Sequence, residues 1–150
     1  MMYRTLDGEI IDLALLSDSH RKVYEEAKRF VEQEPEWTNF TNFWIQKARG
    51  VGISVESALF KILQDIDSRL GIRQGLTRLP NWREELELLI TRHFKSRYAF
   101  CKAAKVDQGH LSAVLGGRKS FSASNLVRIL NRIGFRMDLV RADVSLVGEE

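Results

Sequence analysis

The segment VDQGHLSAVLGGRKSFS, residues 106–122, constrains the fold more than any other stretch of this chain. Asp107 can accept a hydrogen bond from the free amides that begin a helix, and Gly116-Gly117 is expected to follow the end of that helix. This predicts a short helix over Gln108–Leu115, and a second short helix is expected just before it, over Arg97–Ala104. A tight turn then joins the two, which indicates a compact helical domain.

Three residues of this helix pair stand where the two helices would pack together. Cys101 is a small residue inside the first helix, Val106 is apolar and lies in the turn, and Leu111 is an apolar anchor five positions later. The second helix would expose short or hydrogen-bonding side chains: Gln108, Gly109, His110, Ser112 and Ala113. A helix with so slender a face can enter a groove.

The charge is distributed unevenly along the chain. Residues 1–80 carry a net charge of −1, whereas residues 81–150 carry +4. Between Arg92 and Arg136 there are ten basic residues and one acidic residue, Asp107, a local net charge of +9. Such a concentration is typical of a surface that binds a polyanion, although a solvated basic face is the simpler alternative.

Residues 96–122, SRYAFCKAAKVDQGHLSAVLGGRKSFS, together with the helix that follows, resemble the helix-turn-helix of the phage repressor and Cro type, the XRE class. The likeness covers about Trp82 to Gly134 and rests on Phe100-Cys101, Val106, Leu111-Ser112 and Gly117-Arg118. Two positions depart from the pattern: Lys105 replaces a glycine that commonly closes the first helix, and Arg97 replaces a glutamine that commonly opens it. The resemblance implies a mainly α, lambda-repressor-like domain in a sequence-specific transcriptional regulator, such as a repressor, whose partner is double-stranded DNA.

Within that hypothesis the side chains divide into two roles. Gln108 is the best candidate to read a base, because its amide can pair with adenine N6 and N7 in the major groove; Gly109, His110 and Ser112 are weaker candidates on the same face. Four basic residues are expected to contact phosphates, which sets register without reading sequence: Arg97, Lys102, Arg118 and Lys119.

Beyond Gly134 the pattern changes to alternation, with Phe135, Met137 and Leu139 on one side. This predicts a half-buried strand, which needs a partner to be stable. The strand would pair with its twofold mate in a homodimer or fold back on a hairpin at Tyr3–Leu13, and the dimer is favoured because operators are themselves twofold.

The remaining chain suggests two modules, an N-terminal helical module over residues 1–75 and the helix-turn-helix domain with its strand over residues 80–142. Asp7-Gly8 predicts the N-terminal hairpin. Helices are expected from Ser17 or Asp18 to near Pro35, through the aromatic stretch that follows, from a cap at Ser54 to Gly71, over Trp82–Phe94 and over Ala123–Ile133. The aromatic residues are expected to form core, with a partner-binding surface as the alternative: Trp37, Phe40, Phe43 and Trp44.

Several functional classes are disfavoured. No apolar run is long enough to span a bilayer and the first residues lack a signal-peptide pattern, so a cytoplasmic protein without membrane contact is expected. Cys101 is the only cysteine, and the three histidines have no metal-ligand spacing. No catalytic residues, metal site or cofactor are predicted. The main alternative to a regulator is an antitoxin that binds a protein partner through the N-terminal module and autoregulates its operon, and an enzyme fused to a DNA reader is the third.

Overall fold

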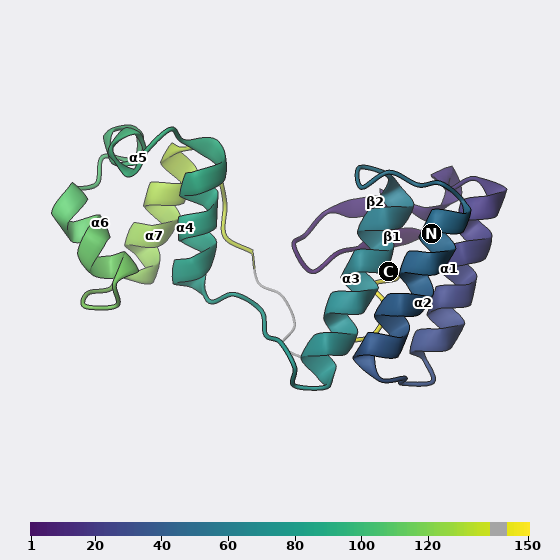
Figure 1. Ribbon diagram of the computed structural model, residues 1–150. Coiled ribbons are helices and arrows are strands. Elements are labelled where there is room, and N and C mark those ends of the chain that lie inside the picture. Colours follow the sequence, from purple (N-terminus) through teal and green to yellow (C-terminus); the bar gives the residue numbers. More distant parts are fainter. Residues whose placement is uncertain (139–143) are drawn as a thin grey trace. The chain divides into compact units, whose positions relative to one another are not determined.

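The computed structural model describes residues 1–138 and 144–150. The chain divides into two compact units (Figure 1): residues 1–78 together with the C-terminal tail, residues 144–150, and a second unit that begins at Leu79. The described residues contain seven α-helices and one two-stranded hairpin, which confirms a mainly α fold with an N-terminal hairpin. The tail belongs to neither of the modules expected from the sequence.

The hairpin consists of β1 (Met2–Arg4) and β2 (Ile10–Asp12), which pair antiparallel with Tyr3 opposite Ile11. A 3-10 turn, η1 (Leu13–Leu15), follows β2. Gly8 has a φ of 92°, a backbone conformation that favours glycine, and its amide donates to the carbonyl of Thr5. The predicted hairpin is therefore confirmed, and its buried face supplies Tyr3 and Ile11 to the core.

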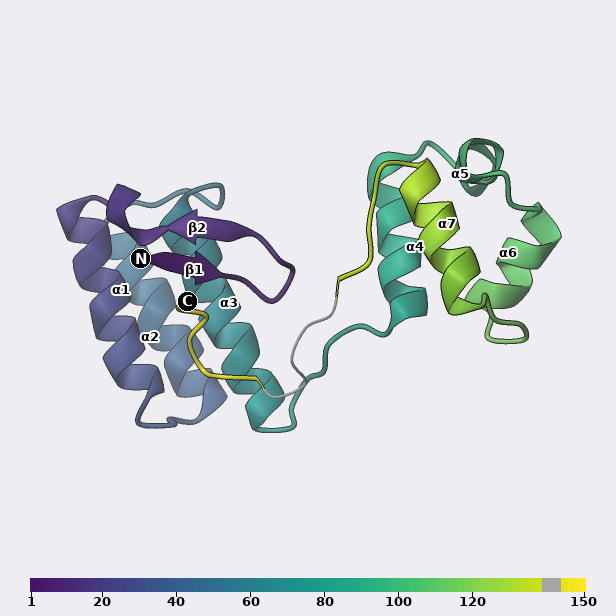
Figure 2. The ribbon, with the colours of Figure 1, turned by 180° about the vertical axis from the view of Figure 1, so that it is seen from behind.

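The helices of the first unit are α1 (Asp18–Val31), α2 (Trp37–Gly50) and α3 (Ala58–Arg73), and each packs against the other two (Figure 2). Ser17 caps α1 by accepting from the amide of His20. Phe40 and Trp44 are buried. The other two aromatic residues of α2, Trp37 and Phe43, pack against the same core, so the expectation that they form core is confirmed.

Both ends of α3 differ from the sequence expectation. Its cap is Ser57, whose hydroxyl accepts from the amide of Phe60, because Ser54 begins a turn that precedes the helix. At its other end α3 continues past Gly71 to Arg73. A Cβ on Gly71 would lie 3.0 Å from the ring of Trp37, so this glycine serves close packing of α2 and does not end the helix.

The second unit contains α4 (Trp82–His93), α5 (Arg97–Ala104), α6 (Gln108–Leu115) and α7 (Ala123–Arg132). All four helices were predicted, and α5 and α6 have the predicted ends. Each begins at a side-chain cap, including a capping box between Asn81 and Glu84. Their apolar faces meet in one core, which consists of Leu86, Ile90, Phe100, Cys101, Ala104, Leu111 and Ile129.

The predicted C-terminal strand is absent from residues 135–138. The amide of Phe135 closes the end of α7 by donating to Leu130, its ring lies against His93 at 5.0 Å, and Met137 is 46% exposed. Residues 135–138 have no neighbouring strand among the described residues of their unit, and Leu139 lies outside the described residues. Pairing of this segment with a second copy stays a prediction. The hairpin does pair with a C-terminal segment, but that segment is the tail and not residues 135–138: Tyr3 and Glu149 form an antiparallel bridge.

Candidate nucleic-acid interface

The turn between α5 and α6 is set by two residues. Lys105 adopts the left-handed conformation, with φ 55° and ψ 51°, and its amide donates to the carbonyl of Cys101. Asp107 then caps α6, its Oδ2 accepting from the amide of His110 at 2.9 Å. The predicted cap at Asp107 is confirmed, and the departure from glycine at Lys105 does not change the backbone conformation.

The residues expected to pack the two helices together lie in the core of the second unit. Cys101 and Leu111 are buried, and Val106 packs against them from the turn. Burial, with a smaller contribution from the charge of Asp107, raises the pKa of the Cys101 thiol. A buried thiol kept in its neutral form is a packing residue and a poor nucleophile.

The outer face of α6 is narrower than expected. Gln108, Gly109 and Ser112 are exposed, whereas His110 is half-buried with its ring 5.1 Å from that of Phe121. Ala113 is buried, which corrects its expected exposure. The reason is that the loop after α6 folds back over it: the amides of Arg118 and Lys119 both donate to the Ala113 carbonyl, at 2.8 and 3.1 Å.

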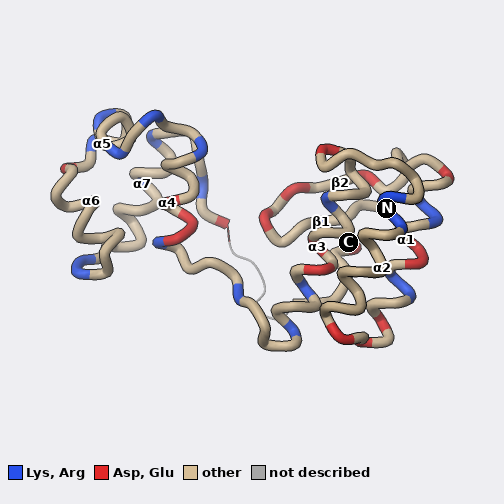
Figure 3. The backbone as a smooth tube through the Cα atoms, in the orientation of Figure 1, with Lys and Arg blue, Asp and Glu red and all other residues tan. Residues whose placement is uncertain are grey.

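The four basic residues proposed to contact phosphates are all exposed. Figure 3 shows Lys and Arg segments on α5 and in the loop that follows α6, the two elements that carry these four residues. Arg97 on α5 forms an ion pair with Glu87 of α4 at 2.8 Å, so a phosphate would have to compete with that carboxylate. Lys102 lies on the same helix, and Arg118 and Lys119 stand next to Gly117, whose φ is 78°.

Arg83 on α4 holds the far end of α6 and was not singled out from the sequence. Its Nε donates to the carbonyl of Val114 at 3.0 Å and its Nη2 to the carbonyl of Lys119 at 3.3 Å, while its guanidinium lies over the ring of Trp82. One side chain therefore fixes both the last turn of α6 and the loop that carries Arg118 and Lys119. No sequence signal marks this role, because both acceptors are backbone carbonyls more than thirty positions away.

Among the described residues, no three His, Cys, Asp or Glu side chains lie close enough to hold a metal ion. The helices described are all too short or too polar to cross a membrane. No known protein family, curated protein or solved structure matches this chain.

Proposed function

We propose that this protein is a sequence-specific DNA-binding regulator that acts as a dimer, with α6 as its recognition helix. The observation that carries the proposal is the combination of a thin exposed face on α6, formed by Gln108, Gly109 and Ser112, with basic residues on the elements just before and after it. Short side chains allow close approach to base edges, and flanking cations can hold the phosphates on either side.

The rigidity of α6 supports this proposal. Asp107 accepts from the amide of His110 in its first turn, and Arg83 donates to the carbonyl of Val114 in its last turn and to that of Lys119 in the loop beyond. A helix held at both ends keeps its outer side chains in one orientation, which recognition by bidentate hydrogen bonds requires. Gln108, in the first turn, is the residue proposed to read adenine.

The proposal of a dimer follows from the length of α6. Eight residues span about 12 Å, so one helix can read only a few base pairs. Two copies related by a twofold axis would read two half-sites and reach useful specificity. The dimer surface is part of the proposal, with the segment at Phe135 and Met137 as the predicted contact.

The salt dependence of binding tests the phosphate contacts. Bound fragments are first selected from random DNA, and binding of the selected sequence is then followed by fluorescence anisotropy across salt concentrations. A dimer that neutralises about six to eight phosphates gives a log-log slope of roughly −5 to −7. Lys119→Ala removes one contact per protomer and should make the slope shallower by about 2, with the preferred sequence unchanged.

Arg128→Ala is the matched control, because Arg128 is an exposed cation on α7 that donates to Asn125 and lies outside the proposed surface. A slope flattened by Arg128→Ala but unaffected by Lys119→Ala would place a different face on DNA.

In the same assay Gln108→Ala should weaken binding to the selected sequence by about 1–3 kcal/mol, and it should leave binding to random DNA nearly unchanged. Equal losses of affinity for the selected and the random DNA would show that Gln108 does not read a base.

A further inference from the structure

The C-terminal tail pairs with β1 of the first unit through one isolated antiparallel bridge, between Tyr3 and Glu149. The amide of Arg4 donates to the carbonyl of Gly148 at 2.8 Å, and the amide of Glu150 donates to the carbonyl of Met2 at 3.0 Å. The tail thus occupies one edge of β1, whose other edge pairs with β2. Addition of a strand to a sheet edge is also how many domains bind a peptide of another protein.

The side chains around the tail select an acidic residue. The carboxylate of Glu149 accepts from the Tyr24 hydroxyl and from Lys28 Nζ, the latter at 2.9 Å. Burial opposes the charge, but these hydrogen bonds and the charge of Lys28 outweigh it, so the pKa of Glu149 lies below its usual range. Leu146 and Val147 pack against the core of the unit, so the surface that the tail covers, called the groove below, accepts two apolar residues before the acidic one.

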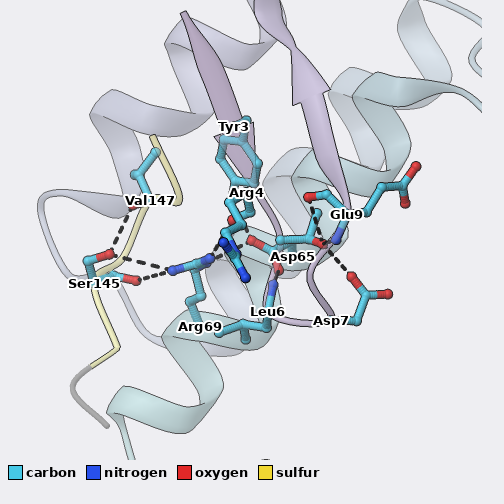
Figure 4. Close-up of polar contacts among 10 residues, drawn as sticks. Tyr3, Arg4, Leu6, Asp7, Glu9, Asp65, Arg69, Ser145 and Val147 are labelled. Atoms are coloured by element: carbon cyan, nitrogen blue, oxygen red, sulfur yellow. Dashed lines mark hydrogen bonds and ion pairs between the residues drawn. The ribbon is translucent and has the colours of Figure 1, made fainter. Parts of the chain in front are cut away.

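Arg69 adds a second contact to the tail, and the space beside it is limited (Figure 4). Its Nη1 donates to the carbonyl of Ser145 at 3.1 Å, and its Nη2 to the carbonyl of Arg4 at 2.8 Å. A Cβ placed on Gly148 would lie 2.1 Å from the Arg4 carbonyl oxygen and 2.7 Å from Arg69 Nη2. The groove therefore requires glycine at this position of any chain that occupies it.

The groove is organised by contacts that do not involve the tail. Arg69 Nε is paired with Asp65 at 2.7 Å, and the same carboxylate accepts from the Tyr3 hydroxyl at 2.6 Å and from the amide of Leu6 at 2.7 Å (Figure 4). Asp65 and Arg69 are buried. Because these contacts join residues outside the tail, we expect them to persist and the groove to keep its shape when the tail leaves, with the β1 edge and the cationic side chain of Lys28 facing water.

We propose that this groove between β1, α1 and α3 is a docking site for an extended segment of a partner protein that carries two apolar residues, a glycine and an acidic residue. The chain's own tail is the internal competitor for that site. A tethered segment acts at an effective concentration of millimolar order, so the tail keeps the groove closed until a stronger ligand displaces it. This inference is independent of the proposed DNA binding, since all of its contacts lie within the first unit.

The probe is a fluorescent peptide with the sequence of residues 144–150, VSLVGEE, titrated into full-length protein. We expect Gly148→Leu to displace the internal tail, because its side chain would clash with the Arg4 carbonyl, and the substitution changes no residue of β1, α1 or α3. The peptide should bind Gly148→Leu at least about tenfold more tightly than the wild type, because the internal competitor is lost. Equal affinity for the two folded proteins would overturn the proposal.

Charge reversal at Lys28 tests the pocket that holds the acidic residue. In the Gly148→Leu background, Lys28→Glu should weaken peptide binding by at least about tenfold. A peptide with lysine in place of Glu149 should recover part of that loss. Lys22→Glu makes the same charge change at an exposed position of α1 and should leave the affinity nearly unchanged. Similar effects of both substitutions would mean that the peptide responds only to net charge, which overturns the site.

Hydrogen exchange in the wild-type protein decides the question even if Gly148→Leu does not fold. The amides of Arg4 and Glu150 bridge the tail and β1. If the tail detaches while the unit stays folded, these amides exchange faster than the buried amides of α3. Exchange as slow as that of α3 would show that the tail opens only on global unfolding, and the proposal would be wrong.

Discussion

Lys105 carries a backbone conformation that glycine adopts at lower cost. Its φ of 55° brings the Cβ of an L-residue close to the following carbonyl, and yet the turn between α5 and α6 depends on it. The chain tolerates this strain because the Lys105 amide and the Asp107 side chain both complete helix ends there. At the scale of single residues, the turn is therefore specified by hydrogen bonds and costs stability at one position.

We expect Lys105→Gly to stabilise the second unit. Relief of the left-handed strain exceeds the added entropy of the unfolded chain, for a net gain of about 0.5–1 kcal/mol. Lys102→Gly is the matched control, since it places the same change inside α5 and should cost about 1 kcal/mol. Denaturant unfolding followed by circular dichroism measures both, and a loss of stability with Lys105→Gly would contradict the strain argument.

At the scale of elements, α6 owes its position to partners at both ends. A helix of eight residues has few internal hydrogen bonds, so its terminal amides and carbonyls weigh heavily in its stability. Asp107 satisfies the first end from within the chain's local sequence. Arg83 satisfies the other from a different helix, which also ties the loop after α6 to α4.

Arg83→Ala should therefore loosen the end of α6 and its loop. The amides of Gly117, Arg118 and Lys119 donate to the last turn of α6, and their hydrogen exchange should accelerate by about tenfold. Arg92→Ala removes an exposed arginine from α4, the helix that also carries Arg83, and should change these exchange rates little. Nuclear magnetic resonance resolves the individual amides, and equal acceleration in both variants would exclude a specific role for Arg83.

At the scale of the whole molecule, the two ends of the chain meet in one unit. The tail joins β1 and α1 only after the chain has passed through the second unit, and Glu149 pairs with Lys28 across 121 positions. Because hydrogen bonds from Tyr24 and Lys28 lower its pKa despite burial, Glu149 links the stability of the first unit to pH.

The direction in which stability changes with pH follows from the lowered pKa of Glu149. The unfolded carboxyl binds its proton at higher pH than the folded one, so this stabilisation is present above about pH 4.5 and is lost as pH falls through the folded value. Glu149→Gln should lower the unfolding free energy of the first unit by about 1–2 kcal/mol at neutral pH, and by progressively less as the pH falls below about 4.5. A Trp82→Phe background leaves Trp37 and Trp44, both in the first unit, as fluorescent reporters during urea unfolding. A difference that persists unchanged at acid pH would contradict the assignment.

Local signals in the sequence were enough for most elements. Ser17, Asp107 and the apolar spacing of α4 to α7 predicted where helices begin and which faces are buried, because a cap and a helical face depend on residues a few positions apart. The same reasoning wrongly placed the cap of α3 at Ser54. Two serines precede the apolar face of this helix, and only the turn between them makes Ser57 the cap.

The sequence by itself determined the hairpin, the helices, the short α5 and α6 with their turn, and the concentration of positive charge on the second module. Tertiary structure alone decided that Gly71 serves packing, that the following loop buries Ala113, that Arg83 holds α6 and that the tail returns to β1. The physical reason is the separation along the sequence of the groups that interact. Caps and apolar periodicity act within about one or two helical turns, whereas these contacts join groups brought together only when the whole chain has closed around its cores.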